Sequence, residues 1–210
     1  MKIKMLFYLI IKRLFDIIFG LIGILFLIPI TIILKVISIC TGDFKSIFFV
    51  QERIGIKGKR IKIIKYRSMV PNAEQKLEEL MEKDENIRKE YLENKKLEND
   101  PRVTKVGRFI RKFSIDELPQ AINVFLGSMT IVGPRPYLPR EIDDMGEYYK
   151  YVIMCKPGLT GLWQVSGRSD VSFNHRLKLD KKYANERSLI FDIKIFFKTF
   201  SVVLFQKGAK

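Results

Sequence analysis

The feature that most constrains this chain is an uncharged, strongly apolar stretch near its N-terminus. Residues 17–34 contain no charged side chain and consist mainly of Ile, Leu and Phe. A straight helix over these residues would cover about 27 Å at ~1.5 Å per residue, just short of a ~30 Å hydrocarbon core. A cleaved signal peptide fits poorly, because Arg13 and Asp16 lie deep in the segment and no small-residue cleavage site follows. We therefore expect residues 1–40 to be inserted in a membrane.

The flanking charges bear on how this segment sits in the bilayer. Lys2, Lys4, Lys12 and Arg13 precede the apolar stretch, and a strongly basic region follows it. The positive-inside rule would keep both flanks on the cytoplasmic side, which a simple span cannot satisfy. Pro29 lacks a backbone donor and clashes with the preceding turn, so we expect a kink or reversal there. A re-entrant helix-break-helix is favoured over a bent single span, and both stay open.

Residues 41–210 have the pattern of a soluble domain attached to that segment. Two short strands at 46–49 and 61–65 are joined through Gly55 and Gly58, which predicts a hairpin. The expected fold class is α+β, mostly helical, with a re-entrant membrane helix, a small β-hairpin and interfacial amphipathic helices.

The rest of this domain is predicted from composition and helical spacing. The acid-rich stretch 72–100 has the composition of a solvent-exposed helix. Residues 104–113 and 115–126 have helical spacing, and the stretch 127–170, which is rich in Gly and Pro, predicts loops. The aromatic stretch 188–205 is either a helix at the membrane interface or a buried core helix.

Composition narrows the class of partner and excludes several kinds of site. The chain has 38 basic and 23 acidic residues, a formal net charge of +15, yet 47% of its residues are hydrophobic. Nucleic acid, an anionic membrane surface and phosphorylated substrates all fit this balance. Cys40 and Cys155 lack zinc-site or disulfide spacing, and His175 is the only histidine. A lone Gly-x-x-Gly beginning at Gly55 is weak support for a nucleic-acid clamp, so we expect no nucleic-acid partner.

An adjacent acidic pair, Asp116 and Glu117, has two interpretations. Ser114 and Glu117 match a capping box, Phe113 and Leu118 match its hydrophobic staple, and Asp116 would favour the helix dipole. A helix start therefore explains these residues without any chemistry. The alternative interpretation is a pair of catalytic carboxylates.

Two segments rich in proline and glycine favour the catalytic interpretation. Pro134 and Pro136 restrict the backbone around Arg135 and present a rigid guanidinium, which is suited to bidentate phosphate contact. A second segment runs from a tight Pro-Gly turn at Pro157 to Arg168. An acidic pair, fixed arginines and a membrane segment together indicate phosphate chemistry at a bilayer.

Taken in order, the motifs of this chain resemble those of the bacterial sugar transferases, the small monotopic phosphoglycosyl transferases. The resemblance extends from about residue 10 to about residue 200. The motifs that carry it are Phe49-x-Gln51-x-Arg53-x-Gly55, Lys65-Tyr66-Arg67-Ser68-Met69, Asp100-x-Arg102-x-Thr104-x-x-Gly107, Arg111-x-x-Ser114-x-Asp116-Glu117-Leu118-Pro119-Gln120, Asn123-Val124-x-x-Gly127-x-Met129, Val132-Gly133-Pro134-Arg135-Pro136, Lys156-Pro157-Gly158-Leu159-Thr160-Gly161-Leu162-Trp163-Gln164 and Asp180-x-x-Tyr183.

This resemblance implies a two-step sugar-1-phosphate transfer. Asp116 would be the nucleophile that attacks the β-phosphorus of a UDP-sugar and releases UMP, leaving an aspartyl phospho-sugar. Polyprenol (undecaprenyl) phosphate would then accept the phospho-sugar. Glu117 would be the metal-site and acid–base partner, with Mg²⁺, or Mn²⁺ in its place, bound at Asp116 and Glu117 to offset the repulsion between carboxylate and phosphate.

The resemblance also implies binding residues, partners and location. Arg135 is the expected phosphate clamp. The other implied residues are Lys65, Arg67 and Arg111 for phosphate binding, and Arg168 and Asp180 on the nucleotide-sugar side. The expected partners are a UDP-sugar, polyprenol phosphate and the bilayer, at the cytoplasmic face of the bacterial inner membrane, and a homo-oligomer is left open. The reaction would be the first membrane step in the assembly of an exopolysaccharide, capsule or other glycoconjugate.

Two positions depart from the family pattern, and one rival function remains. Ile28 precedes Pro29 where some small members have Ser, and Ser128 stands where the family often has an acidic residue. The rival is a basic peripheral membrane scaffold without catalysis, in which Asp116 only caps a helix. Asp116→Asn separates the two, because a helix cap tolerates the change and a nucleophile does not.

Overall fold

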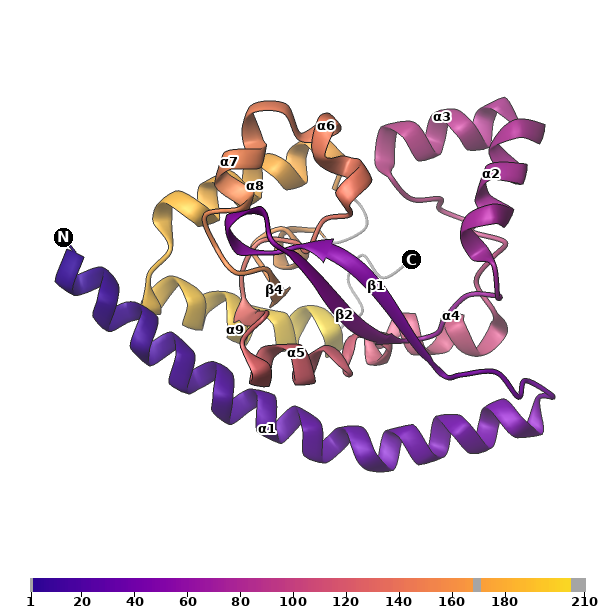
Figure 1. Ribbon diagram of the computed structural model, residues 1–210, viewed down its shortest axis with the longest axis horizontal. Helices are drawn as coiled ribbons and strands as arrows, with labels where there is room; N and C mark the ends of the chain where they lie inside the picture. Colours follow the sequence, from indigo (N-terminus) through magenta and orange to yellow (C-terminus); the bar gives the residue numbers. More distant parts are fainter. Residues whose placement is uncertain (1, 168–170, 205–210) are drawn as a thin grey trace.

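The computed structural model describes residues 2–167 and 171–204, and the chain is mostly helical (Figure 1). It begins with a long apolar helix, α1 (Lys2–Cys40), which by length and composition could enter a membrane. A hairpin of β1 (Phe48–Ile54) and β2 (Arg60–Tyr66) follows. The predicted mixture of many helices and a small hairpin is confirmed.

A second, parallel pair of strands consists of β3 (Thr130–Val132) and β4 (Gly158–Thr160). The other α-helices are α2 (Ala73–Lys83), α3 (Glu85–Asn94), α4 (Lys105–Lys112), α5 (Gln120–Leu126), α6 (Ile142–Met145), α7 (Tyr149–Val152), α8 (Phe173–Glu186) and α9 (Leu189–Leu204). Short 3₁₀ turns lie at Ile56–Gly58, Ile115–Glu117, Pro139–Glu141, Gly146–Tyr148 and Gln164–Ser166.

The predicted helix-break-helix of residues 1–40 is not confirmed, because α1 continues through Pro29 as one helix. Figure 1 shows a curved helix without a reversal. Pro29 removes one backbone donor, and the turn around it is supported from the side by Tyr66. The Tyr66 hydroxyl donates to the Leu27 carbonyl at 3.3 Å and lies 2.6 Å from Thr31 Oγ1. A helix supported in this way bends at proline rather than ending there.

Both halves of α1 pack against the rest of the molecule. In its first half, Phe15 and Phe19 pack against a buried cluster built by the strands, α5, α8 and α9. In its second half, Leu27, Ile30 and Leu34 join another cluster formed with β2, α4 and α5. Figure 1 shows the corresponding arrangement, with α1 running along the side formed by α9, α5 and α4. The membrane segment is therefore part of the core as well as an apolar surface.

Two glycines allow α1 to cross α5 at close range. A Cβ atom on Gly20 would lie 3.0 Å from the backbone nitrogen of Phe125, and one on Gly23 would lie 2.7 Å from Ala121 Cβ. Only residues without a side chain fit such a contact, which is how small residues bring apolar helices together. The α1–α5 contact is the reason that the uncharged stretch contains glycine at these positions.

The predicted hairpin is confirmed, although each strand is longer than expected. The strands pair antiparallel over their whole length, from Phe48 opposite Tyr66 to Ile54 opposite Arg60. Lys57, at φ 56°, lies in the tight turn. Arg53 of β1 and Lys65 of β2 line a pocket, so the hairpin forms one wall of the candidate site.

The acid-rich segment is exposed as predicted, but it forms two helices instead of one. Asp84 ends α2, and its carboxylate accepts hydrogen bonds from the backbone of Asn86 and Ile87 at the start of α3. An aspartate in this position favours a new helix start over continuation of the old helix. In Figure 1, α2 and α3 lie on the opposite side of the molecule from α1.

The aromatic C-terminal segment forms α9 and combines both predicted alternatives. Asp192 and Ile195 are buried, whereas Ile190 and Phe197 are 68% and 67% exposed. One face of α9 therefore belongs to the core, and the other presents large apolar side chains to the surroundings. The parallel strands β3 and β4 were not expected within the loop-rich stretch, because three-residue strands are too short to show a periodic pattern.

Candidate active site

The acidic pair lies in a tight turn between two helices and not at the start of a regular helix. Asp116 and Glu117 belong to the 3₁₀ turn Ile115–Glu117, and α5 begins only at Gln120. Ser114 has φ 56° and ψ 23°, the left-handed conformation, whereas a capping serine is extended. The predicted capping box is therefore wrong. A left-handed non-glycine residue beside two carboxylates is the kind of backbone outlier found at functional sites.

A lysine from the hairpin approaches this pair. Lys65 Nζ lies 3.0 Å from Glu117 Oε1, and both side chains are partly exposed. Asp116 is half-buried next to them. Burial and the neighbouring charge of Glu117 raise the pKa of Asp116 to about 6, while Lys65 and Arg111 act in the opposite direction. The structure thus brings Asp116, Glu117, Lys65 and Arg111 into one electrostatic cluster.

A pocket adjoins these carboxylates and is lined mainly by polar and basic side chains. Its walls come from β1, β2, the start of α5 and the segments that carry β4 and Arg135. The lining residues are Arg53, Lys65, Glu117, Gln120, Arg135, Pro136, Gly158, Leu159, Trp163 and Gln164. Three predicted residues, Lys65, Glu117 and Arg135, therefore share one pocket.

Buried polar atoms without a hydrogen-bond partner gather at this pocket. Within the described residues, five such atoms belong to its lining: Arg53 Nε, Gln120 Nε2, Arg135 Nε, Trp163 Nε1 and Gln164 Oε1. Proteins rarely leave buried donors unpaired, because desolvation without a partner costs about 1–3 kcal/mol. A polar ligand that pairs with these atoms would remove that cost.

Positive charge in the pocket exceeds what its neighbours neutralise. Burial and then the nearby charge of Arg135 lower the pKa of Arg53 to about 10, and the same two causes lower that of Arg176 to about 10. The guanidinium of Arg135 also lies 5.3 Å from the ring centre of Trp163. The guanidinium of Arg135 repels those of Arg53 and Arg176, which favours a bound anion beside them, and phosphate is one anion that arginine binds in bidentate fashion.

Asp180 lies behind the pocket wall instead of lining it. It is fully buried, and burial is the main cause that raises its pKa to about 7. Its Oδ2 accepts a hydrogen bond from the Tyr137 hydroxyl at 2.8 Å and from the Arg135 backbone at 3.4 Å. The position of Asp180 indicates that it supports the Arg135 segment, and its expected place on the nucleotide-sugar side stays a prediction.

The remaining predicted residues lie in different surroundings. Arg67 makes a bidentate ion pair with Asp43 and is not among the pocket residues, and Arg111 donates to Ser68 Oγ at 2.9 Å. Arg168 lies outside the described residues. Ser128, which stands where the family often has an acidic residue, has its hydroxyl hydrogen-bonded to Asn123.

Several pocket residues had no predicted role. Arg53, Trp163 and Gln164 stand within the motifs quoted above, and Gln120 closes the motif of the acidic pair, but a motif does not show which side chains converge. Arg176 belongs to none of these motifs. Its packing against the ring of Trp163, 5.4 Å from the ring centre, depends on the placement of α8. No local pattern in the sequence predicts that contact.

The donor set fits Mg²⁺ only in combination with a ligand. Within residues 2–167 and 171–204, no group of three or more His, Cys, Asp or Glu side chains could hold a metal ion. Mg²⁺ usually takes one or two carboxylates and completes its shell with waters and substrate phosphates. Asp116 and Glu117, which are neighbours in the chain and whose charges interact, supply two carboxylates, so the residues present are compatible with the expected ion.

Comparison with known proteins decides the family. Residues 7–206 match the family model described as "Bacterial sugar transferase". The chain belongs to the bacterial sugar transferase family. This membership was expected from the ordered motifs, and it is confirmed over nearly the whole chain.

Three relatives have amino-acid sequences similar to that of this sugar transferase. It is 46% identical over 198 residues to a "UDP-galactose-lipid carrier transferase" of Erwinia amylovora, covering 94% of this chain and 41% of the relative. It is 44% identical over 200 residues to an "Undecaprenyl-phosphate galactose phosphotransferase" of Salmonella typhimurium, covering 94% and 41%. The "Exopolysaccharide production protein ExoY" of Sinorhizobium fredii is 38% identical over 198 residues, covering 94% of this chain and 87% of the relative. The chain thus spans about two fifths of the length of the first two.

Proposed function

We propose that this sugar transferase moves a sugar 1-phosphate from a UDP-sugar to polyprenol (undecaprenyl) phosphate at a membrane. One observation carries the proposal: Glu117, next to Asp116 in the chain, lines a pocket in which buried polar atoms of arginine, glutamine and tryptophan side chains have no hydrogen-bond partner. A nucleophile beside a cationic pocket suits a diphosphate substrate. The names of the relatives, which mention UDP-galactose, a lipid carrier and undecaprenyl phosphate, support the same substrate classes.

The proposed reaction has two balanced steps. In the first, a carboxylate oxygen of Asp116 forms a bond to the sugar-bearing phosphorus, and the bond from that phosphorus to UMP breaks, so that UMP leaves with the electron pair. In the second, a phosphate oxygen of the polyprenol phosphate attacks the same phosphorus. The bond to Asp116 then breaks, which restores the carboxylate and releases a polyprenol diphospho-sugar. Such a covalent route is accompanied by ping-pong kinetics.

Other residues of the pocket prepare this chemistry. Arg135 and Arg53 hold the diphosphate and offset the charge of the approaching carboxylate. Lys65 holds Glu117 in place by its ion pair. Glu117 acts as the acid–base partner, and Asp180 keeps the Arg135 segment in position through the Arg135 backbone and Tyr137.

Asp116 and Glu117 would hold Mg²⁺, with Mn²⁺ as a substitute, and the ion would neutralise phosphate charge when bound. We predict that UMP release stops when EDTA is added and returns when Mg²⁺ is restored in excess. The measurement is the rate of UMP release from purified protein in detergent or nanodiscs. Undiminished release in chelator would overturn the metal assignment and leave charge neutralisation to the arginines.

The membrane arrangement is also a proposal. Because α1 packs along the domain from its first half to its second, it cannot cross a bilayer upright without drawing that domain into the lipid. We propose that α1 enters one leaflet and leaves on the same, cytoplasmic side of the bacterial inner membrane. The exposed apolar face of α9 and Phe109 of α4, which is 59% exposed, would lie at the interface as amphipathic anchors.

The decisive experiment uses Asp116→Asn, because Asn cannot form an acyl phosphate. We predict a loss of turnover by several orders of magnitude with a panel of UDP-sugars and polyprenol phosphate, measured as UMP release. Without acceptor, the wild-type protein should gain the mass of a phospho-sugar, and the variant should gain none. Asp143→Asn, at an exposed carboxylate of α6, is the matched control and should behave like wild type.

Stability separates this result from misfolding. The folded pKa of Asp116, about 6, is higher than its ordinary value of 3.8, so its ionised form at pH 7 opposes folding. Replacement by neutral Asn should therefore leave the melting temperature at pH 7 unchanged or higher. A folded Asp116→Asn protein with near-normal turnover would favour the non-catalytic membrane scaffold.

A further inference from the structure

The short strand β3 is bonded on both edges, although the sheet has only two strands. On one edge, β3 pairs with β4, and the Thr130 nitrogen donates to the Pro157 carbonyl at 2.9 Å. On the other edge its partner is the membrane helix. Asp16 Oδ1 accepts hydrogen bonds from the Ile131 nitrogen at 2.8 Å and from Thr130 Oγ1 at 2.9 Å. A side chain of α1 thus occupies the place of a third strand.

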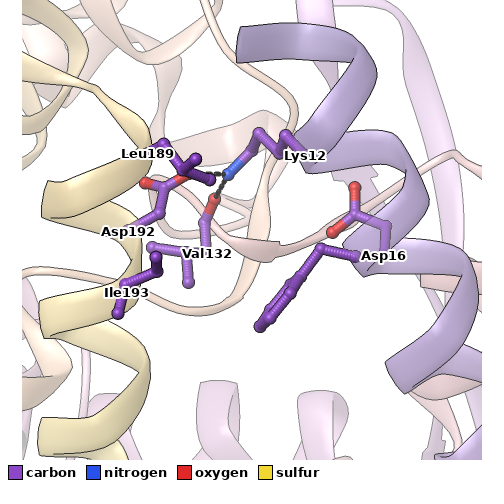
Figure 2. A pocket seen from close by; sticks show the side chains of 7 residues that line it. Lys12, Asp16, Val132, Leu189, Asp192 and Ile193 are labelled. Atoms are coloured by element: carbon purple, nitrogen blue, oxygen red, sulfur yellow. Dashed lines mark hydrogen bonds and ion pairs between the residues drawn. The ribbon is translucent and has the colours of Figure 1, made fainter.

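A second residue of α1 bonds β3 at Val132, the residue after Ile131. Lys12 Nζ donates to the Val132 carbonyl at 2.7 Å and also pairs with Asp192 of α9 at 2.5 Å. Figure 2 shows Lys12 reaching from α1 to Val132 and to Asp192 on the facing helix, with Asp16 projecting from the same helix α1. The Tyr183 hydroxyl donates to the same carbonyl at 2.9 Å. Two charged side chains of this mainly apolar helix therefore form hydrogen bonds with one strand.

These charges are too deeply placed to serve as membrane flanks. Asp16 is only 2% exposed, and an isolated carboxylate in such a position is strongly unfavourable unless it is hydrogen-bonded. Asp16 is hydrogen-bonded to Thr130 and Ile131 of β3, and Lys12 is hydrogen-bonded to the next residue, Val132. The neighbouring charge, Arg13, has different partners, since it donates to the Val124 and Phe125 carbonyls at the end of α5.

The strand held in this way leads directly to Arg135. After Val132, the Gly133 nitrogen donates to the Thr160 carbonyl at 2.9 Å, and the Pro134 carbonyl accepts from the Gly158 nitrogen at 2.8 Å. The backbone between β3 and Arg135 is thus bonded at consecutive residues, Pro134 restricts its dihedral angles, and Pro136 restricts those of Arg135. A shift of β3 away from β4 or α1 would be transmitted to the guanidinium, because Gly133 and Pro134 are held in place by these hydrogen bonds.

We propose that Asp16 and Lys12 are positioning residues for the active site, which act through β3 on Arg135. The membrane helix would then build part of the site, beyond anchoring the protein. The proposal rests on the proposed function in one respect, namely that Arg135 binds the phosphates of the donor. Asp16 supplies two hydrogen bonds to β3, and Lys12 and Tyr183 each donate one to the Val132 carbonyl.

The test compares two substitutions at the same position. Asp16→Asn keeps an oxygen that can accept both hydrogen bonds and loses only the charge, whereas Asp16→Ala loses both bonds. Trp163 is the only tryptophan of the chain and lies beside Arg135, so its fluorescence reports the pocket without any turnover. The measurements are titration of Trp163 fluorescence with UDP and with inorganic phosphate, UMP release, and flotation with lipid vesicles.

We expect Asp16→Ala to bind UDP at least tenfold more weakly and to raise KM for the donor, with normal flotation and a melting temperature that still shows a folded protein. Asp16→Asn should restore most of the affinity. Tyr8→Phe is the matched control, because Tyr8 bonds Asp192 in the same buried network but does not touch β3, and it should bind UDP like wild type.

Three outcomes would overturn the proposal. The first is equal UDP affinity in Asp16→Ala and wild type. The second is an equal loss of UDP affinity in Asp16→Ala and Asp16→Asn. The third is a loss of UDP affinity in Tyr8→Phe as large as that in Asp16→Ala. Either result would indicate that these residues dock α1 on the domain in general and do not position Arg135. If Asp16→Ala does not fold, Lys12→Met with the same titration replaces it, since Met keeps the length of the side chain but cannot bond Val132. Failure of the proposed function looks different, because wild type would then bind UDP without releasing UMP from any donor.

Discussion

Asp116 differs from the other acidic residues that the structure describes in having a carboxylate that is both sheltered and next to a second carboxylate. Two opposing influences act on it, because burial and Glu117 raise its pKa while Lys65 and Arg111 lower it. A pKa of about 6 leaves most of the population ionised at pH 7, and the carboxylate is a better base than an exposed aspartate. Both properties are useful in a nucleophile.

The first residue-scale prediction concerns pH. Protonation removes the nucleophile, so the single-turnover rate of UMP release at low Mg²⁺ should fall about tenfold per unit as the pH drops below about 6. A bound cation favours the ionised carboxylate, so added Mg²⁺ should move the inflection to lower pH. Rapid-quench measurements at several Mg²⁺ concentrations check both statements. A rate that stays flat down to about pH 4.5 at low Mg²⁺ would contradict the assignment.

Asp16 shows how little a single residue reveals before the fold is known. In the sequence it is an acidic residue near a membrane segment, and it served only to argue against a signal peptide. In the structure it is buried and accepts two hydrogen bonds from a strand more than a hundred residues away in the chain. No spacing rule connects those positions, because the contact depends on how α1 lies across the domain.

At the scale of elements, the contact between α1 and α5 depends on two missing side chains. A Cβ on Gly23 would already approach Ala121 Cβ to 2.7 Å, so a larger residue forces the helices apart. We predict that Gly23→Leu lowers the stability of the detergent-solubilised protein by about 1–3 kcal/mol through overpacking. The measurement is a thermal or denaturant unfolding curve of the purified protein.

Because α5 follows the acidic pair directly, Gly23→Leu should also reduce turnover. Leu25→Ala is the control, since Leu25 is 63% exposed on the same helix and its loss leaves the α1–α5 contact unchanged. If Gly23→Leu and Leu25→Ala change the unfolding curve equally, α1 does not dock on α5 as described.

At the scale of the whole molecule, the two ends of α1 test how the protein sits in the membrane. Cys40 is an exposed native thiol at one end, and Lys4→Cys places another at the other end, while Cys155 is buried. We predict that a membrane-impermeant maleimide added to intact cells labels neither end, and that both react after lysis. The physical reason is that α1 packs on one domain along its length.

A bent single span gives a different labelling pattern. One of the two cysteines would then react in intact cells and the other only after lysis. Labelling of Cys40 alone in the parent protein provides the reference for its reactivity. This experiment decides between the two membrane arrangements that the flanking charges leave open.

Local order in the sequence was enough to predict an apolar membrane segment, the hairpin, the exposure of the acid-rich segment and, through ordered motifs, the family. These follow from hydrophobicity, turn residues and spacing, which act over a few residues at a time. Only the tertiary structure decided that α1 continues through Pro29, because Tyr66 and the packed domain support the bend. It alone decided that Arg53, Arg135 and Trp163 share a pocket, and that Asp16 completes the edge of β3. Such contacts join segments far apart in the chain, and their free energy exists only once the helices and strands have packed.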